Sequence, residues 1–110
     1  GEKLLPVIIE YKGTKGKLEK TDRQGLVVLR DATGKFDYKQ AIPKYAVNGA
    51  AYYAANIIKD TEYKEVVVVG INGTKDAANE IHYEVRTYVI NASEPELPIY
   101  VDDFENLDFF

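Results

Sequence analysis

The apolar positions of the chain change their period several times, and each change predicts a different element. Residues 4–12 form a continuous apolar run that turns polar only at its end, which is typical of a strand covered on both faces. Residues 13–24 are polar and rich in Lys and Gly, which predicts a loop. Between residues 26 and 38, two short apolar stretches flank the turn sequence of residues 31–34, and this order favours a hairpin.

A helical period replaces this pattern over residues 42–59. Apolar side chains there recur at steps of three and four, and they are Ala46, Ala50, Tyr53, Ala54 and Ile57. Pro43 suits the first turn of a helix, where its missing N–H costs nothing. Because most of the stripe is alanine, we expect this helix to lie close to a sheet.

The second half of the chain favours strands. The β-branched run of residues 65–71 predicts a buried strand, and Asn72-Gly73 after it predicts a turn. Alternating apolar positions over residues 81–90 predict a half-buried strand. Strand, helix and strand, followed closely by a returning strand, predict an α/β fold with a mixed sheet and one flanking helix.

Two prolines separate this pattern from the last apolar residues. Pro95 and Pro98 predict a loop, after which residues 99–101 are expected to form a short strand. Residues 102–110 are acidic and aromatic, and they are typical of a helix start or of a frayed end.

Composition narrows the classes of protein. The 110 residues suit one small domain, and no apolar run approaches the length of about 20 residues that spans a bilayer. The absence of cysteine excludes disulfides and thiolate metal sites and fits a reducing cytoplasm. Methionine is absent even from position 1, so we expect an excised segment of a longer protein.

The charge is distributed unevenly along the chain. Residues 1–47 carry ten Lys and Arg against six Asp and Glu, a net charge of +4, whereas residues 48–110 carry four against twelve, a net charge of −8. Such asymmetry can mark one side that faces a polyanion, although two solvated faces would give the same count.

The candidate chemistry lies at the end of the first predicted strand, in Glu10-Tyr11-Lys12. Residues two apart in a strand share a face, so Glu10 and Lys12 project together where the Lys-rich loop begins. A carboxylate is a hard oxygen ligand for Mg²⁺, and a neighbouring lysine can hold a phosphate or assist an attacking water. The alternative is an accidental pair of solvated residues, because Glu-x-Lys is common by chance.

Two stretches resemble known nucleases. Residues 6–13 resemble the second half of the PD-(D/E)XK nuclease motif. Residues 41–54 resemble the helix that follows this motif in restriction enzymes, notably the R subunits of type I systems and related fused nuclease–methylases. Many of these nucleases carry Gln-x-x-x-Tyr on that helix, and here Asn48 and Tyr52 have the same spacing, with Asn in place of Gln.

The resemblance implies a restriction endonuclease-like fold, truncated at its N-terminus, that cleaves double-stranded DNA with Mg²⁺. Glu10 would be a metal ligand, the backbone carbonyl of Tyr11 another, and Lys12 the catalytic lysine. Asn48 and Tyr52 would support the site or contact DNA. Methylase and specificity subunits of a restriction complex would be the partners.

One element of the family pattern is missing. The family places an Asp, often after Pro, on the strand before the Glu-x-Lys strand, yet only Gly1-Glu2-Lys3 precedes Leu4. We therefore expect this carboxylate upstream of Gly1, in a longer protein, and poor cleavage by the fragment alone. A degenerate nuclease fold that binds DNA or a subunit without catalysis is one alternative. An α/β domain with no nucleic-acid role is another.

Two further features could bind a ligand. A basic cluster in the predicted loop could hold DNA phosphates, or it could be a solvated loop, and its members are Lys15, Lys17, Lys20 and Arg23. His82 is the single histidine of the chain, so we expect a surface strand residue rather than a metal ligand.

Overall fold

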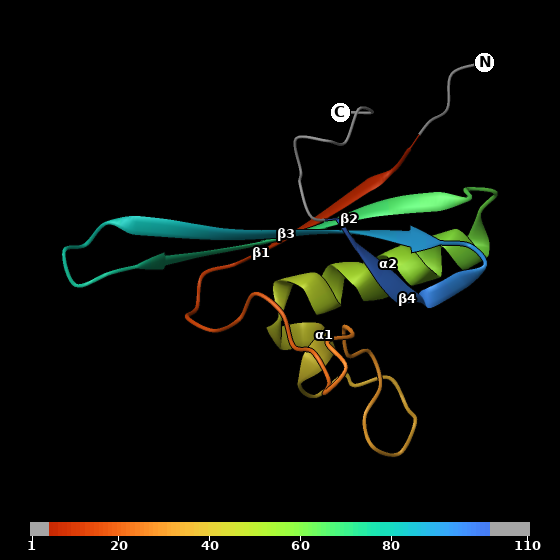
Figure 1. The fold of residues 1–110 in the computed structure, drawn as a ribbon, viewed down its shortest axis with the longest axis horizontal. Helices are drawn as coiled ribbons and strands as arrows, with labels where there is room; N and C mark the ends of the chain where they lie inside the picture. The colour runs from red at the N-terminus through yellow and green to blue at the C-terminus, as the bar shows by residue number, and fades with distance from the viewer. Residues whose placement is uncertain (1–4, 102–110) are drawn as a thin grey trace.

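The strands form one mixed sheet, with two helices on one of its faces (Figure 1). The computed structural model describes residues 5–101. The strands are β1 (Val7–Lys12), β2 (Glu65–Lys75), β3 (Ile81–Asn91) and β4 (Glu94–Val101), and they lie side by side in that order. β1 is parallel to β2, and the other neighbours are antiparallel. The predicted α/β fold with a mixed sheet is confirmed.

The helical segment predicted over residues 42–59 is two helices, α1 (Ala41–Lys44) and α2 (Ala46–Asp60). Tyr45 separates them with an extended backbone, φ −119° and ψ 135°. No side chain caps α2. Instead the N–H groups of Ala46 and Val47 donate to the backbone carbonyls of Lys17 and Leu18, at 3.0 and 2.9 Å. The break is thus stabilised by a distant loop, because unpaired N–H groups at a helix start need acceptors.

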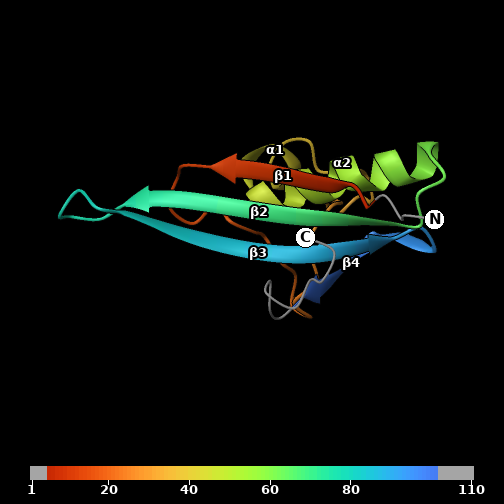
Figure 2. The ribbon, with the colours of Figure 1, turned by 90° about the horizontal axis from the view of Figure 1, so that it is seen from above.

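The core lies between α2 and the sheet. Figure 2 shows the sheet from above, with the helices on its far side. The alanines of the predicted stripe are buried, but Tyr53 of that stripe is 57% exposed and Ile57 is half-buried. Ala51, Ala55 and Ile58 are buried in their place, so the buried face of α2 is rotated from the predicted one.

Gly70 in β2 makes the close approach possible, because a Cβ at this position would lie 2.5 Å from Cγ2 of Val47 and 2.8 Å from its backbone nitrogen. The helix therefore packs directly against the backbone of the central strand.

The segment between β1 and α1 completes the core from the outer side of α2. Leu18, Val27 and Leu29 are buried in the same apolar cluster as α2 and the sheet. An isolated antiparallel bridge joins Arg30 to Phe36 around the turn where the sequence favours a hairpin. Most of the segment has no regular structure, so its position depends on side-chain contacts with α2.

The predicted turn at Asn72-Gly73 is wrong, because β2 continues through both residues to Lys75. Asn72 pairs with Glu84 and Gly73 with Tyr83 in a long two-stranded arm. The chain reverses only after Asp76, whose Oδ1 accepts hydrogen bonds from the N–H groups of Ala78 and Glu80 at 2.8 and 3.0 Å. An Asp side chain that binds the backbone two residues on is a stronger turn signal here than Asn-Gly.

The predicted loop at Pro95 and Pro98 is also wrong, since both prolines lie in β4. β4 is an edge strand, and proline is tolerated there because the outer side needs no N–H donor. β1 lies at the other edge of the described sheet, with Ile9 and Tyr11 exposed by 60% and 55%. Residues 5–101 therefore leave one face of β1 uncovered, whereas its continuous apolar run predicts cover on both faces.

Two predictions concern residues outside the described range, namely the start of the first strand at Leu4 and the element at residues 102–110. Among the helices described, none is long and apolar enough to cross a membrane.

Candidate functional site

Glu10 and Lys12 lie on the helix-covered face at the end of β1. In the parallel ladder they stand beside Gly70 and Asn72 of β2. The Cγ and Oε1 atoms of Glu10 lie 3.9 Å from the point that a Cβ on Gly49 would occupy, which places this carboxylate beside the first turns of α2. Lys12 donates from Nζ to the backbone carbonyl of Pro43 at 2.9 Å. The structure thus brings both side chains to the junction of β1, α1 and α2.

The Glu10 carboxylate is half-buried, and within residues 5–101 it accepts no hydrogen bond and forms no ion pair. It lies near the N-terminus of α2, where the helix dipole favours negative charge and weakens with distance from the first turn. A hard oxygen donor that no protein group occupies is the chemistry that Mg²⁺ prefers, so Glu10 fits a divalent cation.

Tyr11 can assist Glu10 through its backbone only. Its side chain lies on the opposite face of the sheet, where the phenol oxygen is 2.7 Å from the point that a Cβ on Gly73 would occupy. The predicted ligand from this residue, its main-chain carbonyl, is compatible with that arrangement.

Asn48 is fully buried and bound to the backbone of the segment before α1. Its Nδ2 donates to the carbonyls of Lys20 and Val28 at 2.9 and 2.7 Å, while its Oδ1 accepts from the N–H of Lys20 at 2.9 Å. These bonds occupy both donors of the amide and leave it no access to DNA. The geometry favours a supporting role, in which Asn48 holds the basic segment against α2.

Tyr52 also contacts this segment. Its hydroxyl lies 2.7 Å from that of Tyr38, and its ring packs edge-on against Phe36 with centroids 5.1 Å apart. The pKa of Tyr52 is lowered, first by the hydrogen bond with Tyr38 and then by one with Asn56. The hydrogen bond between the two tyrosines raises the pKa of Tyr38. Tyr52, like Asn48, thus secures the segment around the site.

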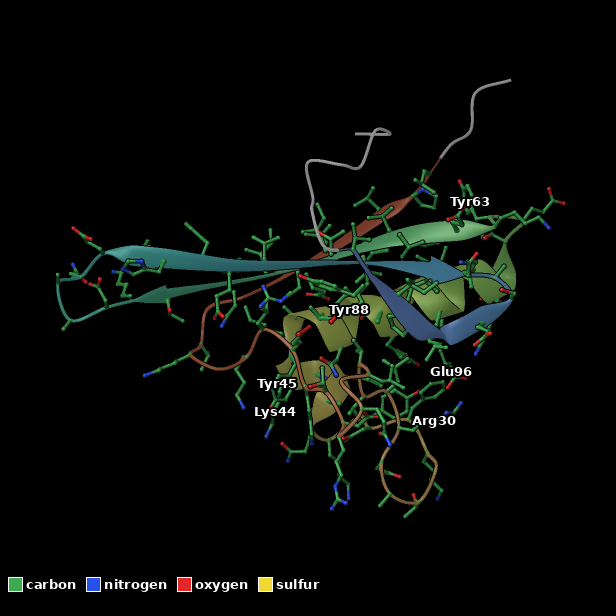
Figure 3. All side chains as sticks on the ribbon, viewed as in Figure 1. Arg30, Lys44, Tyr45, Tyr63, Tyr88 and Glu96 are labelled. Atoms are coloured by element: carbon green, nitrogen blue, oxygen red, sulfur yellow. The ribbon has the colours of Figure 1, made fainter. Side chains whose placement is uncertain are left out.

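Lysines surround the end of β1. Lys17 places its Nζ 4.7 Å from the ring centroid of Tyr45, a cation–π contact. Lys15 is exposed in the turn that precedes it. Lys44 is also exposed, and Figure 3 shows it beside Tyr45. Within residues 5–101, none of Lys12, Lys15, Lys17 and Lys44 forms an ion pair, so their charges remain available to an anion.

Sequence reasoning missed Asn72. This side chain is fully buried, and its Nδ2 donates to the carbonyl of Thr14 at 2.8 Å. Among residues 5–101, no group forms a hydrogen bond with its Oδ1. Asn72 was missed because it was assigned to a turn. The available signal was a polar residue that continues the alternation of the buried apolar residues of β2.

A second group of potential ligands lies at the tip of the β2–β3 arm, the far left of Figure 1. Ligand atoms of Asp76, Glu80 and His82 lie within 4.8 Å of one another, and all three residues are exposed. The Nε2 atom of His82 is 2.6 Å from Oδ2 of Asp76, and this bond is the main cause of the lowered pKa of Asp76. His82 is thus a surface strand residue, as predicted, but it lies beside two carboxylates in a group that could hold a metal ion.

Comparison with known proteins gives one informative relative. An 89-residue stretch, 80% of the chain, is 34% identical to the type II restriction enzyme and methyltransferase RM.BcgI of Heyndrickxia coagulans. The chain resembles part of a restriction–modification enzyme. It spans 12% of the length of that relative. No protein-family model matches the chain, and no solved structure matches it significantly.

Proposed function

We propose that this chain is the DNA-cleaving part of a restriction–modification enzyme. The observation that carries the proposal is the pair Glu10 and Lys12, on one sheet face beside α2, with a carboxylate that binds no described protein group. The similarity to a relative whose name joins a restriction enzyme to a methyltransferase supports the same class. DNA is the substrate, and its phosphodiester bond is the target of hydrolysis.

Each side chain has a role in this proposal. When bound, Mg²⁺ supplies a water of lowered pKa and stabilises the negative charge that develops on the phosphate. Glu10 would hold the ion, and the carbonyl of Tyr11 would be a second donor. Lys12 places its ammonium group against the scissile phosphate or the attacking water. Lys15 and Lys17 hold the neighbouring phosphates, while Asn48 and Tyr52 keep their segment in place.

A single carboxylate holds Mg²⁺ weakly, because this ion retains several waters and gains little from one protein ligand. We propose that a second carboxylate comes from a chain segment outside the 110 residues, in a longer protein. The name of the relative favours a fused nuclease–methylase over the R subunit of a type I system. Methylase and specificity functions would then be the partners in the complex.

Cleavage of supercoiled plasmid in MgCl₂ tests the proposal. The complete protein that contains this chain should cut, and Glu10→Ala and Lys12→Ala should each abolish cutting without lowering the melting temperature. Glu62→Ala and Lys64→Ala are matched controls, because both residues are exposed just before β2, at the opposite end of the sheet. The controls should cut at the normal rate.

The outcomes separate the proposal from its alternatives. If both site variants cut as fast as the unmodified protein, Glu10 and Lys12 are not the catalytic pair. If the complete protein binds DNA but never cuts it, the chain is a degenerate nuclease fold used for docking. The isolated chain of 110 residues is expected to cut poorly, because the proposal places the second carboxylate outside it.

A further inference from the structure

Asn72 presents a buried oxygen that no described group satisfies. The side chain is 0% exposed, and its Oδ1 has no hydrogen-bond partner. The orientation of the amide is fixed, because the other atom must donate to the carbonyl of Thr14 at 2.8 Å, and a carbonyl can only accept. A buried acceptor without a donor is costly and rare in folded proteins, so this oxygen requires an explanation.

The position of Asn72 in the sheet limits which donors can reach it. Its neighbours in register are Lys12 on β1 and Glu84 on β3. A carboxylate cannot donate. Arg86 lies one step further along the same face of β3, in register with Gly70, and its guanidinium donates to the carbonyl of Val85 at 3.1 Å.

Of the two side chains in register with Asn72, Lys12 is the one that can donate. Neighbouring strands lie about 4.8 Å apart, well within the reach of a lysine side chain. The ammonium group carries three donors, and in the structure one of them binds the exposed carbonyl of Pro43 at 2.9 Å. Movement of Nζ away from Pro43 toward the sheet would bring it to the unsatisfied oxygen.

We propose that Asn72 is a positioning residue for Lys12, an inference that rests on the proposed function of the Glu10–Lys12 site. Its Oδ1 accepts a hydrogen bond from the Lys12 ammonium when the lysine leaves the Pro43 carbonyl. Lys12 then has two acceptors, one on the α1 side and one in the sheet. The Asn72 position keeps the ammonium beside Glu10, where the proposed substrate phosphate would bind.

Two substitutions separate this role from a purely structural one. Asn72→Asp keeps an oxygen acceptor but loses the amide that donates to Thr14. Asn72→Ala loses both. If Asn72 acts only by holding the loop at Thr14, the two variants should behave alike; if it positions Lys12, only Asn72→Ala should release the lysine.

The first measurement is the rate at which acetic anhydride acetylates Lys12, followed by mass spectrometry on the complete protein. We expect Lys12 to react more slowly than the exposed Lys15. Asn72→Ala should raise the Lys12 rate several-fold and leave the Lys15 rate unchanged, while Asn72→Asp should keep Lys12 protected. Equal release in both variants, or no release in Asn72→Ala, overturns the inference. If Asn72→Ala does not fold, an unprotected Lys12 in Asn72→Asp overturns it alone.

The second measurement is the steady-state kinetics of DNA cleavage. Asn72→Ala should lower kcat with little change in KM, and Asn72→Asp should retain most of kcat. A parallel loss in both variants, with a lower melting temperature, shows a structural role and contradicts the inference. The acetylation test needs no cleavage: if Lys12 protection depends on Asn72 but no DNA is cut, the proposed function fails while the contact stands.

Discussion

The side chain of Asn48 and the backbone of Lys20 hydrogen-bond to each other in both directions. Oδ1 of Asn48 accepts from the N–H of Lys20, and Nδ2 donates to its carbonyl, each at 2.9 Å. A third bond, from Nδ2 to the carbonyl of Val28 at 2.7 Å, completes the contact. One buried amide in the first turn of α2 therefore holds the long irregular segment that carries the basic residues beside the site.

Asn48→Ala should be among the most destabilising polar substitutions in this chain. It leaves the N–H of Lys20 and the carbonyl of Val28, both half-buried, without their Asn48 partner, so we expect a loss of about 2–3 kcal/mol in the free energy of unfolding. Urea denaturation followed by circular dichroism measures it. Asn56→Ala, on the same helix but half-buried, should cost less than about 1 kcal/mol. Equal losses in the two variants would contradict this role of Asn48.

Gly70 should not tolerate a side chain. An alanine Cβ at this position would overlap Val47 and push α2 from the sheet, so we expect Gly70→Ala to cost about 1–3 kcal/mol of stability. Gly13 is the matched control, because the atoms nearest to its Cβ position are 3.8 Å away. Gly13→Ala should change the stability by less than about 0.5 kcal/mol. A normal melting temperature for Gly70→Ala would show that the helix can move away without cost.

The Arg30–Glu96 pair joins the irregular segment to β4, and Figure 3 shows the two side chains facing each other. It is bidentate, with Nε–Oε1 and Nη2–Oε2 distances of 2.6 and 3.0 Å, and the Arg30 contact lowers the pKa of Glu96. Because the pair is partly exposed, we expect Glu96→Gln to cost only about 0.5–1 kcal/mol at pH 7.

The sign of the pH dependence follows from the lowered pKa of Glu96. Its contribution is complete above the pKa of the unfolded chain and is lost as the pH falls through the lower pKa of the folded state. The stability curves of the unmodified protein and of Glu96→Gln should therefore converge at acid pH and in high salt. Curves that stay parallel from pH 7 to acid pH would show that the ion pair does not stabilise the fold.

Lys15 and Lys17 should contribute to DNA affinity through charge. Each phosphate contact that is removed should reduce the salt dependence of the binding constant by about 0.9 in the log–log slope. Fluorescence anisotropy with a labelled duplex at several KCl concentrations measures this slope for Lys15→Gln and Lys17→Gln. Lys64→Gln is the control. If all three variants keep the slope of the unmodified protein, the lysines do not contact phosphates.

The sequence predicts elements well where one physical signal dominates. The β-branched run of β2 and the alternation in β3 predict strands, and strands lie at both places. Residues 81–85 of β3 are exposed, however, so only the second half of this strand has the predicted buried side. The break at Tyr45 is not predictable from local sequence, because the acceptors that stabilise it belong to Lys17 and Leu18, far back along the chain. The full length of β2 escapes prediction for a different, local reason: two turn signals compete, and the turn chemistry of Asp76 outweighs that of Asn72-Gly73.

The site shows the same limit. The period of two in a strand is enough to place Glu10 and Lys12 on one face. The groups beside them come from elsewhere in the chain: Pro43 from α1, and Asn72 from β2, which follows the crossover helix and pairs with β1. The roles of Glu10, Tyr11, Lys12, Lys15 and Lys17 remain predictions. Those of Asn48 and Tyr52 do as well, with a geometry that favours support over DNA contact.

Two groups in the described part of this chain could hold the metal ion, and the central claim is that Glu10 does so. The decisive measurement is the single-turnover rate of DNA cleavage as a function of Mg²⁺ concentration, for the complete protein, Glu10→Gln and Glu80→Gln. Glu80 belongs to the exposed group with Asp76 and His82. We expect Glu10→Gln to cut at least about 10²-fold more slowly, the typical loss when charge stabilisation is removed, and Glu80→Gln to match the unmodified protein. Normal cleavage by Glu10→Gln with loss in Glu80→Gln would contradict it.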